Sequence, residues 1–144
     1  MSRFLDPLRA EQLDSVRWMT LTPLRYESTL LSDLVSVPAR FITDFASVPR
    51  WLPVTWYLAG NTAHRPAVIH DWLYQRHVVE GIERGTADAV LYEAMGADEI
   101  EPIPAWQQWI IWSGVRAGGW VAWRNHERRG AQLNPKWTAA GWPA

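Results

Sequence analysis

The chain has 144 residues, 14 Lys and Arg against 15 Asp and Glu, 11 tryptophans and no cysteine. This length fits one domain, and a net charge of -1 gives no field that would attract nucleic acid. The lack of cysteine excludes disulfides, thiolate zinc sites and a cysteine nucleophile, so any metal must have oxygen or imidazole ligands. Residues 1–10 contain no apolar run, which predicts no signal peptide and a protein made in the cytoplasm.

Short runs of β-forming residues occupy the first third of the chain, at residues 16–21, 34–37 and 40–43. Their partial alternation of apolar and polar positions predicts a small antiparallel sheet. Ser47 is expected to cap a short helix or turn over residues 51–58.

Three helices are predicted after the sheet. The first begins near Pro66 and ends before Gly81. The second is capped by Thr86, covers residues 87–95 and stops at Gly96, and the short linker predicts that it packs antiparallel to the first.

The third helix is expected from Pro104 to about Arg124, followed by an irregular tail over residues 130–144. Residues 1–129 are therefore predicted to form a single α+β domain with a small antiparallel sheet, a helical hairpin and a Trp-rich C-terminal helix.

Chemistry-bearing side chains gather on the helical hairpin. At about 100° per residue, His70 and Tyr74 share one face of the first helix, and Asp88 and Tyr92 share one face of the second. If these faces meet, Asp88 would orient His70, which would then take a proton from water as a general base. Asp71 points elsewhere and would hold a hard cation such as calcium.

The segment His70-Asp71-Trp72-Leu73-Tyr74 resembles the H-D-x-x-Y helix of secreted phospholipase A2. The following Ala87-Asp88, with Tyr92 and Met95, is similar to the next helix of that family. The resemblance covers residues 66–95. It implies that His70 is the base, that Asp71 binds calcium, that Asp88 orients the base and that Tyr74 hydrogen-bonds in the same network.

A broader resemblance covers most of the chain. Residues 37–50 (V-P-A-R-F-I-T-D-F-A-S-V-P-R), residues 67–74 (A-V-I-H-D-W-L-Y), and the Ala-Asp and Ala-Met pairs of residues 87–95 are similar to a family of uncharacterised proteins from tailed bacteriophages and prophages. That family usually has glycine where this chain has Arg40, a difference that matters only if the turn needs a positive φ. Asp44 lies in the first motif and is either a further oxygen ligand or an Asx-turn residue.

Alternatives remain open for these polar residues. His70, Asp71 and Asp88 fit either a reactive site or a buried network that fixes two helices. His64 and His77 are weaker candidates, and His64 with His70, Asp71 and Asp88 suggests a metal phosphohydrolase only at a compressed spacing.

The C-terminal third combines indoles with basic residues. Residues 100–144 hold seven of the tryptophans and five Lys and Arg against two Glu. Core packing, a protein interface and a lipid interface are the competing interpretations. Gln107, Gln108 and Arg116 interrupt the apolar run, which argues against a transmembrane helix. The predicted interface stripe consists of Trp106, Trp109, Trp112, Arg116, Trp120 and Trp123.

Two functional hypotheses follow. The first is a calcium-assisted hydrolase of a lipid or other ester, with His70, Asp88, Tyr74 and Tyr92 in its site and Asp71 and Asp44 at the cation. The second is a non-catalytic virion or tail-assembly component that docks onto phage proteins through the Trp/Arg-rich helix. The protein would then reside in the host cytoplasm or in the virion, with peripheral membrane contact as a further option.

Overall fold

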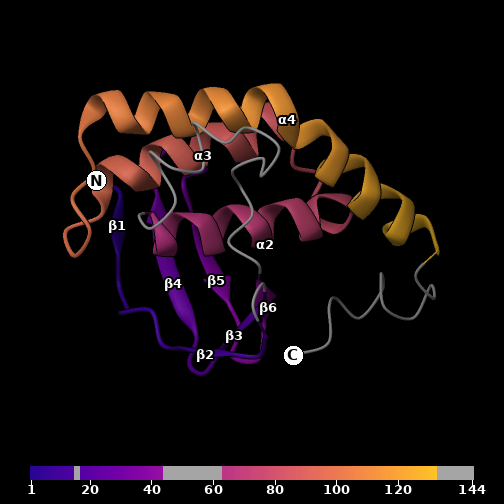
Figure 1. Ribbon diagram of the computed structural model, residues 1–144, viewed down its shortest axis with the longest axis horizontal. Coiled ribbons are helices and arrows are strands. Elements are labelled where there is room, and N and C mark those ends of the chain that lie inside the picture. Colours follow the sequence, from indigo (N-terminus) through magenta and orange to yellow (C-terminus); the bar gives the residue numbers. More distant parts are fainter. Residues whose placement is uncertain (15–16, 44–62, 133–144) are drawn as a thin grey trace.

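A computed structural model describes residues 1–14, 17–43 and 63–132 (Figure 1). All its strands precede its helices, which confirms the predicted α+β class. Asp44, Ser47 and the expected helix or turn over residues 51–58 lie outside the described residues, as do residues 133–144 of the predicted tail.

The larger part of the core rests on a sheet of three antiparallel strands. It consists of β1 (Arg3–Phe4), β4 (Leu24–Ser28) and β5 (Asp33–Val37), in the order β1-β4-β5. Side chains alternate between the two faces of a strand, so Leu24 and Tyr26 are buried together on one face of β4. This buried face packs against the helices.

A second antiparallel sheet joins β2 (Ala10–Gln12), β3 (Trp18–Thr20) and β6 (Ile42–Thr43), in the order β2-β3-β6. The sequence predicted one sheet. The structure has two because residues 34–37 pair with β4 in a hairpin, whereas the strands predicted at 16–21 and 40–43 pair with each other.

The turn before β6 requires a left-handed backbone at Arg40, where φ is 66°. Its amide donates to the carbonyl of Thr20 at 2.7 Å, and the Thr20 hydroxyl accepts from the amide of Phe41 at 2.9 Å. Glycine adopts this conformation more readily than arginine does. The substitution of arginine for the glycine of the resembling family therefore falls where a positive φ is needed.

The first helix of the hairpin, α2 (His64–Glu80), begins two residues before the predicted Pro66. Proline has no N–H and is accommodated in the first turn of a helix, where that donor would be unpaired. The helix ends as predicted at Gly81, whose φ of 68° suits the residue after a helix.

The second helix of the hairpin is α3 (Arg84–Ala97). The prediction that Thr86 caps it is wrong, because Glu83 is the N-cap and its carbonyl accepts the amide of Ala87 at 3.0 Å. Gly96 is likewise inside the helix, which continues to Ala97.

A carboxylate on α3 fastens this helix to the first sheet. Glu93 accepts hydrogen bonds from the hydroxyl of Tyr26 at 2.7 Å, from the hydroxyl of Ser28 at 2.8 Å and from the amide of Leu30 at 2.8 Å. These bonds fix how far α3 is shifted along β4.

The third helix, α4 (Ala105–Gln132), extends about two turns beyond the predicted end near Arg124 and runs without a break through residue 129. Figure 1 shows it along the outer edge of the molecule, with α3 and α2 between it and the first sheet. All three helices contact one another.

The core has two parts. One lies between the first sheet, α2 and α3, and the other lies between α3 and α4. The buried members of the second part are Ala63, Leu91, Met95, Ile103, Ile111 and Val115.

Candidate functional site

The antiparallel hairpin brings His70 of α2 and Asp88 of α3 together, as predicted. The distance between His70 Nε2 and Asp88 Oδ1 is 2.7 Å. Tyr74, one turn after His70 on α2, donates its hydroxyl to the same oxygen at 2.5 Å. The two α2 side chains also stack at a tilt, with ring centroids 4.1 Å apart.

Two arginine side chains contact the second carboxylate oxygen of Asp88. Arg116 of α4 donates from Nη1 to Asp88 Oδ2 at 2.8 Å. Arg84, one turn before Asp88 on α3, places its Nη1 3.5 Å from the same oxygen and also donates to the carbonyls of Val115 and Arg116 at 3.3–3.4 Å. One carboxylate therefore joins α2, α3 and α4. We call these five side chains the Asp88 hub: His70, Tyr74, Arg84, Asp88 and Arg116.

Burial and charge set the protonation of the hub. Burial lowers the pKa of His70 below its usual value, and this outweighs the opposing effect of Asp88. Burial alone would raise the pKa of Asp88, but the hydrogen bonds from His70, Tyr74 and Arg116 hold it below its usual range. Burial and the adjacent carboxylate both raise the pKa of Tyr74. At neutral pH the hub therefore holds a neutral imidazole, a carboxylate and a protonated phenol.

These states fix the direction of the central hydrogen bond. An ionised carboxylate only accepts, so the neutral imidazole carries its proton on Nε2 and donates it to Asp88. A carboxylate has about four acceptor positions. His70, Tyr74 and Arg116 donate three hydrogen bonds to them and Arg84 adds an ion pair, so Asp88 is satisfied within the fold.

The accessibility of the hub limits its chemistry. Asp88 is 0% exposed and His70 is 1% exposed. A general base must be within reach of the water or substrate whose proton it takes. Asp88 is therefore placed to orient His70, as in a catalytic His-Asp pair, but the imidazole is buried inside the protein.

The two predicted cation ligands differ in what the structure shows. Asp71 accepts a short hydrogen bond from the hydroxyl of Thr43, which joins α2 to β6. Asp71 therefore helps to hold α2 against β6, and its role as a cation ligand stays a prediction. Asp44 lies outside the described residues. In the part of the chain that the structure describes, no three His, Asp or Glu side chains form a group that could hold a metal ion.

Tyr92, predicted as part of the site, lies away from the hub. Its side chain is 38% exposed, and its ring meets Trp112 of α4 edge to face at 6.3 Å. One turn separates Tyr92 from Asp88 on α3, but α4 lies over that turn and takes the tyrosine as a packing partner.

The predicted interface stripe on α4 divides between two faces. Trp112 is partly buried against the second part of the core, and Trp123 packs on the first part with its ring 5.0 Å from that of Tyr74. Arg116 belongs to the Asp88 hub, and its side chain is 37% exposed. The interface role of the stripe stays a prediction, and its most exposed members are Trp106 at 56%, Trp109 at 60% and Trp120 at 48%.

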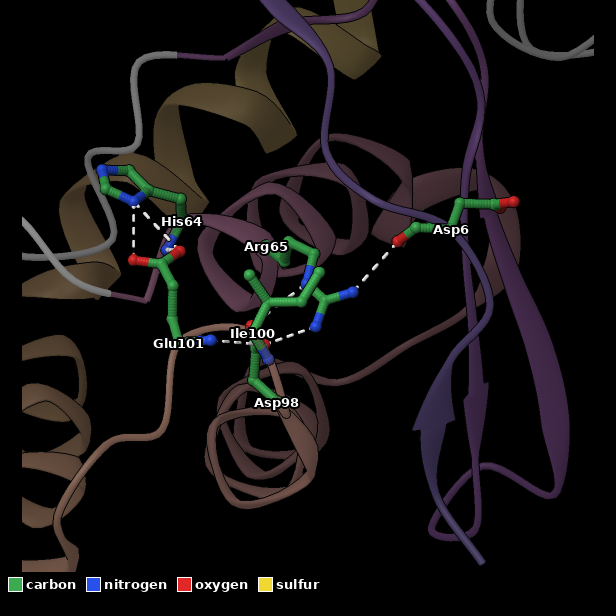
Figure 2. Close-up of polar contacts among 6 residues, drawn as sticks. All are labelled: Asp6, His64, Arg65, Asp98, Ile100 and Glu101. Carbon is green, nitrogen blue, oxygen red and sulfur yellow. Dashed lines mark hydrogen bonds and ion pairs between the residues drawn. The ribbon is translucent and has the colours of Figure 1, made fainter.

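A second polar cluster, shown in Figure 2, was not predicted. Arg65 of α2 forms an ion pair with Asp98 and donates from Nη1 to the backbone carbonyl of Asp6 at 3.0 Å. Asp98 also accepts the amides of Ile100 and Glu101 at 3.0 and 3.1 Å, an Asx-turn that directs the chain from α3 toward α4. The sequence signal for the turn is an aspartate directly after a helix.

His64 lies at the edge of this second cluster and away from His70. Its Nδ1 is 3.0 Å from a carboxylate oxygen of Glu101, and both side chains are partly exposed. The compressed His64, His70 and Asp88 arrangement considered for a phosphohydrolase is therefore not assembled, because His64 pairs with another carboxylate. The side chain of His77 is outside the described residues.

No helix in the described part of the chain has an apolar stretch long enough to cross a membrane. No curated protein and no solved structure matches the chain. The family described as "Protein of unknown function (DUF1353)" matches residues 18–115, which include both helices of the hairpin and every residue of the Asp88 hub except Arg116. The chain belongs to the DUF1353 family.

Proposed function

We propose that this DUF1353 protein is a non-catalytic component of a tailed phage or prophage particle, and that it docks through the outer face of α4. The observation that carries the proposal is the contrast within this helix. Arg116 donates a hydrogen bond to the buried Asp88, while Trp106, Trp109 and Trp120 are about half exposed.

The buried hub supports a structural role for the His-Asp pair. Its carboxylate, on α3, accepts hydrogen bonds from side chains of α2 and α4, and its imidazole is inside the protein. Buried polar networks of this kind fix the arrangement of the elements that supply them. The motifs of residues 37–50 and 67–74, which resemble tailed-phage proteins, support the phage setting and a location in the host cytoplasm or the assembled virion.

Exposed tryptophans beside an arginine support docking onto protein. Tryptophan and arginine are enriched among the residues that dominate binding energy at interfaces. The guanidinium of Arg124 lies 5.1 Å from the centre of the Trp120 ring, so both residue types occupy this face. Phage structural or assembly proteins are the proposed partners, and neither nucleic acid nor a lipid headgroup is required.

The second candidate is the phospholipase-like hydrolase. The 2.7 Å contact between His70 and Asp88 favours it, because the same pairing orients a general base. In that mechanism His70 would activate water, Asp88 would orient the imidazole, and calcium at Asp71 and Asp44 would stabilise the developing oxyanion.

One experiment separates the two candidates. The phage or prophage that encodes the chain is made to carry either Trp106→Ser/Trp109→Ser/Trp120→Ser or His70→Gln, and the yield of infectious particles is counted. We expect the triple variant to lose at least tenfold in yield. The matched control is Leu34→Ser, which removes an exposed apolar side chain from β5 and should leave the yield unchanged.

The enzymatic candidate is tested on the purified chain. We expect no calcium-dependent hydrolysis of phospholipid vesicles or of soluble esters above that of His70→Gln. The proposal fails if the parent chain hydrolyses these substrates and His70→Gln, while keeping its melting temperature, does not.

A further inference from the structure

The outer face of α4 carries side chains whose spacing is the same in both directions along the helix. Residues spaced by three and four positions form one stripe on this face. Its members are Trp106, Trp109, Ser113, Ala117 and Trp120, at spacings of 3, 4, 4 and 3. Ser113 is at the centre, with the indole of Trp109 on one side and the small Ala117 on the other, and Trp106 and Trp120 are at the two ends.

We propose that the outer face of α4 pairs with the same face of a second copy of this chain, antiparallel and with Ser113 on the two-fold axis. This inference rests on the proposed function and names its first docking partner. A two-fold interface brings one patch against itself, so position 113 − n faces position 113 + n of the partner.

The side chains that this register opposes are complementary in size. Trp109, which is 60% exposed, faces the small and exposed Ala117 of the other copy. Ser113 faces its own equivalent, which lets the two helices approach closely. Trp106 faces Trp120, and indole pairs favour such offset or edge-to-face contacts.

Charge also supports a second copy. Arg124 continues the stripe by one turn, and in an antiparallel pair it lies near the beginning of the other copy's α4, which follows the exposed Glu99. The segment from Ala105 to Arg124 contains no acidic residue, and Glu127 is outnumbered by Arg124, Arg128 and Arg129, so negative charge precedes α4 and net positive charge lies toward its C-terminal end. An antiparallel pair brings opposite charges together at both ends, and a parallel pair would bring like charges together.

The same charge pattern disfavours a lipid surface. An anionic membrane attracts Arg124 beside its indole but repels the exposed Glu99 near the other end of the stripe. A second copy places an opposite charge near each end of the stripe.

The exposed area predicts a modest affinity. A tryptophan side chain buries roughly 150–250 Å² when fully covered, so six half-exposed indoles supply on the order of 600 Å². This is about half of the roughly 1,200 Å² at the lower end of stable interfaces. The remainder must come from neighbouring positions, and we therefore expect a reversible dimer that dissociates on dilution.

Cysteine crosslinking of the full chain tests the register, because the native chain has no cysteine. Ser113→Cys is on the axis and should form a disulfide-linked dimer on oxidation with diamide. Ala117→Cys is the matched control on the same face. With a rise of 1.5 Å per residue, its two copies are offset by about 12 Å along the helices, beyond the reach of a disulfide. We expect Ser113→Cys to crosslink at least tenfold faster.

Sedimentation equilibrium across the micromolar range tests the dimer itself. We expect the parent chain to change from monomer to dimer with concentration, Arg124→Glu to weaken the dimer at least tenfold, and Glu99→Arg combined with Arg124→Glu to restore it. Circular dichroism of each variant checks that the fold is retained.

The inference would be overturned by a parent chain that is monomeric at every concentration, or by a dimer that survives Trp106→Ser/Trp109→Ser/Trp120→Ser. Equal crosslinking at positions 113 and 117 would also overturn it, as would a monomer that sediments with anionic vesicles. A monomer that still needs its α4 tryptophans for particle yield would leave the proposed function intact. A dimer with His70-dependent hydrolysis would overturn the proposed function and leave the dimer.

Discussion

The inner and outer faces of α4 use the same residue types in opposite ways. On the inner face, Arg116 reaches a carboxylate that is 0% exposed, and Trp123 packs against Tyr74. On the outer face, Arg124 lies over Trp120, and both side chains are exposed. Composition alone therefore does not assign a role to a Trp/Arg-rich helix, because the role of each residue depends on what its face meets.

The difference has an energetic consequence. Removing one member of a buried charged network leaves the others desolvated and unpaired, which is strongly destabilising. Removing an exposed side chain changes the folded state little. Substitutions on the two faces should thus separate folding from docking.

Asp88→Asn should have the largest effect. It keeps the shape of the side chain but leaves Arg116 and Arg84 without a counter-charge inside the hub. We expect the free energy of unfolding in urea to fall by about 3 kcal/mol. The matched control is Glu27→Gln, which breaks the exposed pair with Arg3 and should leave stability nearly unchanged. Equal losses in the two variants would show that the hub is not what holds the helices together.

Tyr74→Phe should have the next largest effect. It removes one hydroxyl that donates to the buried carboxylate at 2.5 Å, and hydrogen bonds to charged groups contribute about 1.5–3 kcal/mol. Tyr92→Phe changes the same atom on a partly exposed ring and should be nearly neutral in the same urea titration. If Tyr74→Phe left the free energy of unfolding unchanged, the hydroxyl of Tyr74 would not contribute to the stability of the hub.

Acid should weaken the fold through His70. Its pKa is lowered in the folded state, so below pH 6.5 the unfolded chain binds a proton that the folded chain resists. The stabilisation that comes from the neutral His70 is therefore fully present above the unfolded pKa. It declines as the pH falls below that value, by at most about 1.4 kcal/mol per pH unit. His70→Gln keeps a donor toward Asp88 without this titration, and it should flatten the slope of unfolding free energy between pH 6.5 and pH 5. An unchanged slope in this variant would assign the acid sensitivity to other groups.

Arg40→Gly should stabilise the chain slightly. It relieves a left-handed backbone at φ 66°, and this gain exceeds the greater freedom of glycine in the unfolded chain by about 0.5–1 kcal/mol. Ser36→Gly, at an extended and exposed position of β5, gains no such relief and should be destabilising. A loss of stability in Arg40→Gly would mean that the arginine side chain matters more than the backbone strain.

The smallest effect on folding is expected on the outer face. Trp109→Ser should change the free energy of unfolding by less than about 0.5 kcal/mol, because the indole is 60% exposed. Trp123→Ser, on the inner face of the same helix, should cost about 2 kcal/mol. Thermal unfolding of both proteins compares the two faces directly, and similar losses would argue against the division.

The sequence predicted the helical hairpin well because its signals are local. Pro66 and Gly81 bracket the first helix closely, and the spacing of His70 and Tyr74 placed them on one face. With a short linker before α3, that face had to meet Asp88. The α+β class followed from the order of the strand-forming and helical segments.

Features that depend on tertiary packing were not predictable in the same way. Tryptophans occur around much of α4, so the spacing of indoles did not show which face is inside. The better signal was the pair Ile111 and Val115, which are buried, together with the small and buried Gly114 and Gly118. The role of Arg116 depended on a carboxylate 28 residues away, and no local pattern identifies that partner.

Strand pairing was also beyond local reasoning. The runs at 34–37 and 40–43 are adjacent in sequence, yet they join different sheets because the turn at Arg40 reverses the chain toward Thr20. Similarly, Glu83 rather than Thr86 begins α3, since the helix can start without a side-chain cap when its first turn is packed.

The state of the His70 ring tests the central claim most directly, since a structural hub requires a neutral imidazole and a general base requires access to water. Nitrogen-15 NMR of the full chain labelled at histidine would report the tautomer and the protonation of His70 as pH is lowered. We expect the Nε2–H tautomer at neutral pH, and an imidazole that takes up its second proton only at a lower pH than an ordinary histidine does. A His70 ring that titrates at its ordinary pKa of about 6.5 would contradict a buried hub and favour the hydrolase, whereas a proton on Nδ1 alone would contradict both, because Asp88 would then accept no proton from the ring.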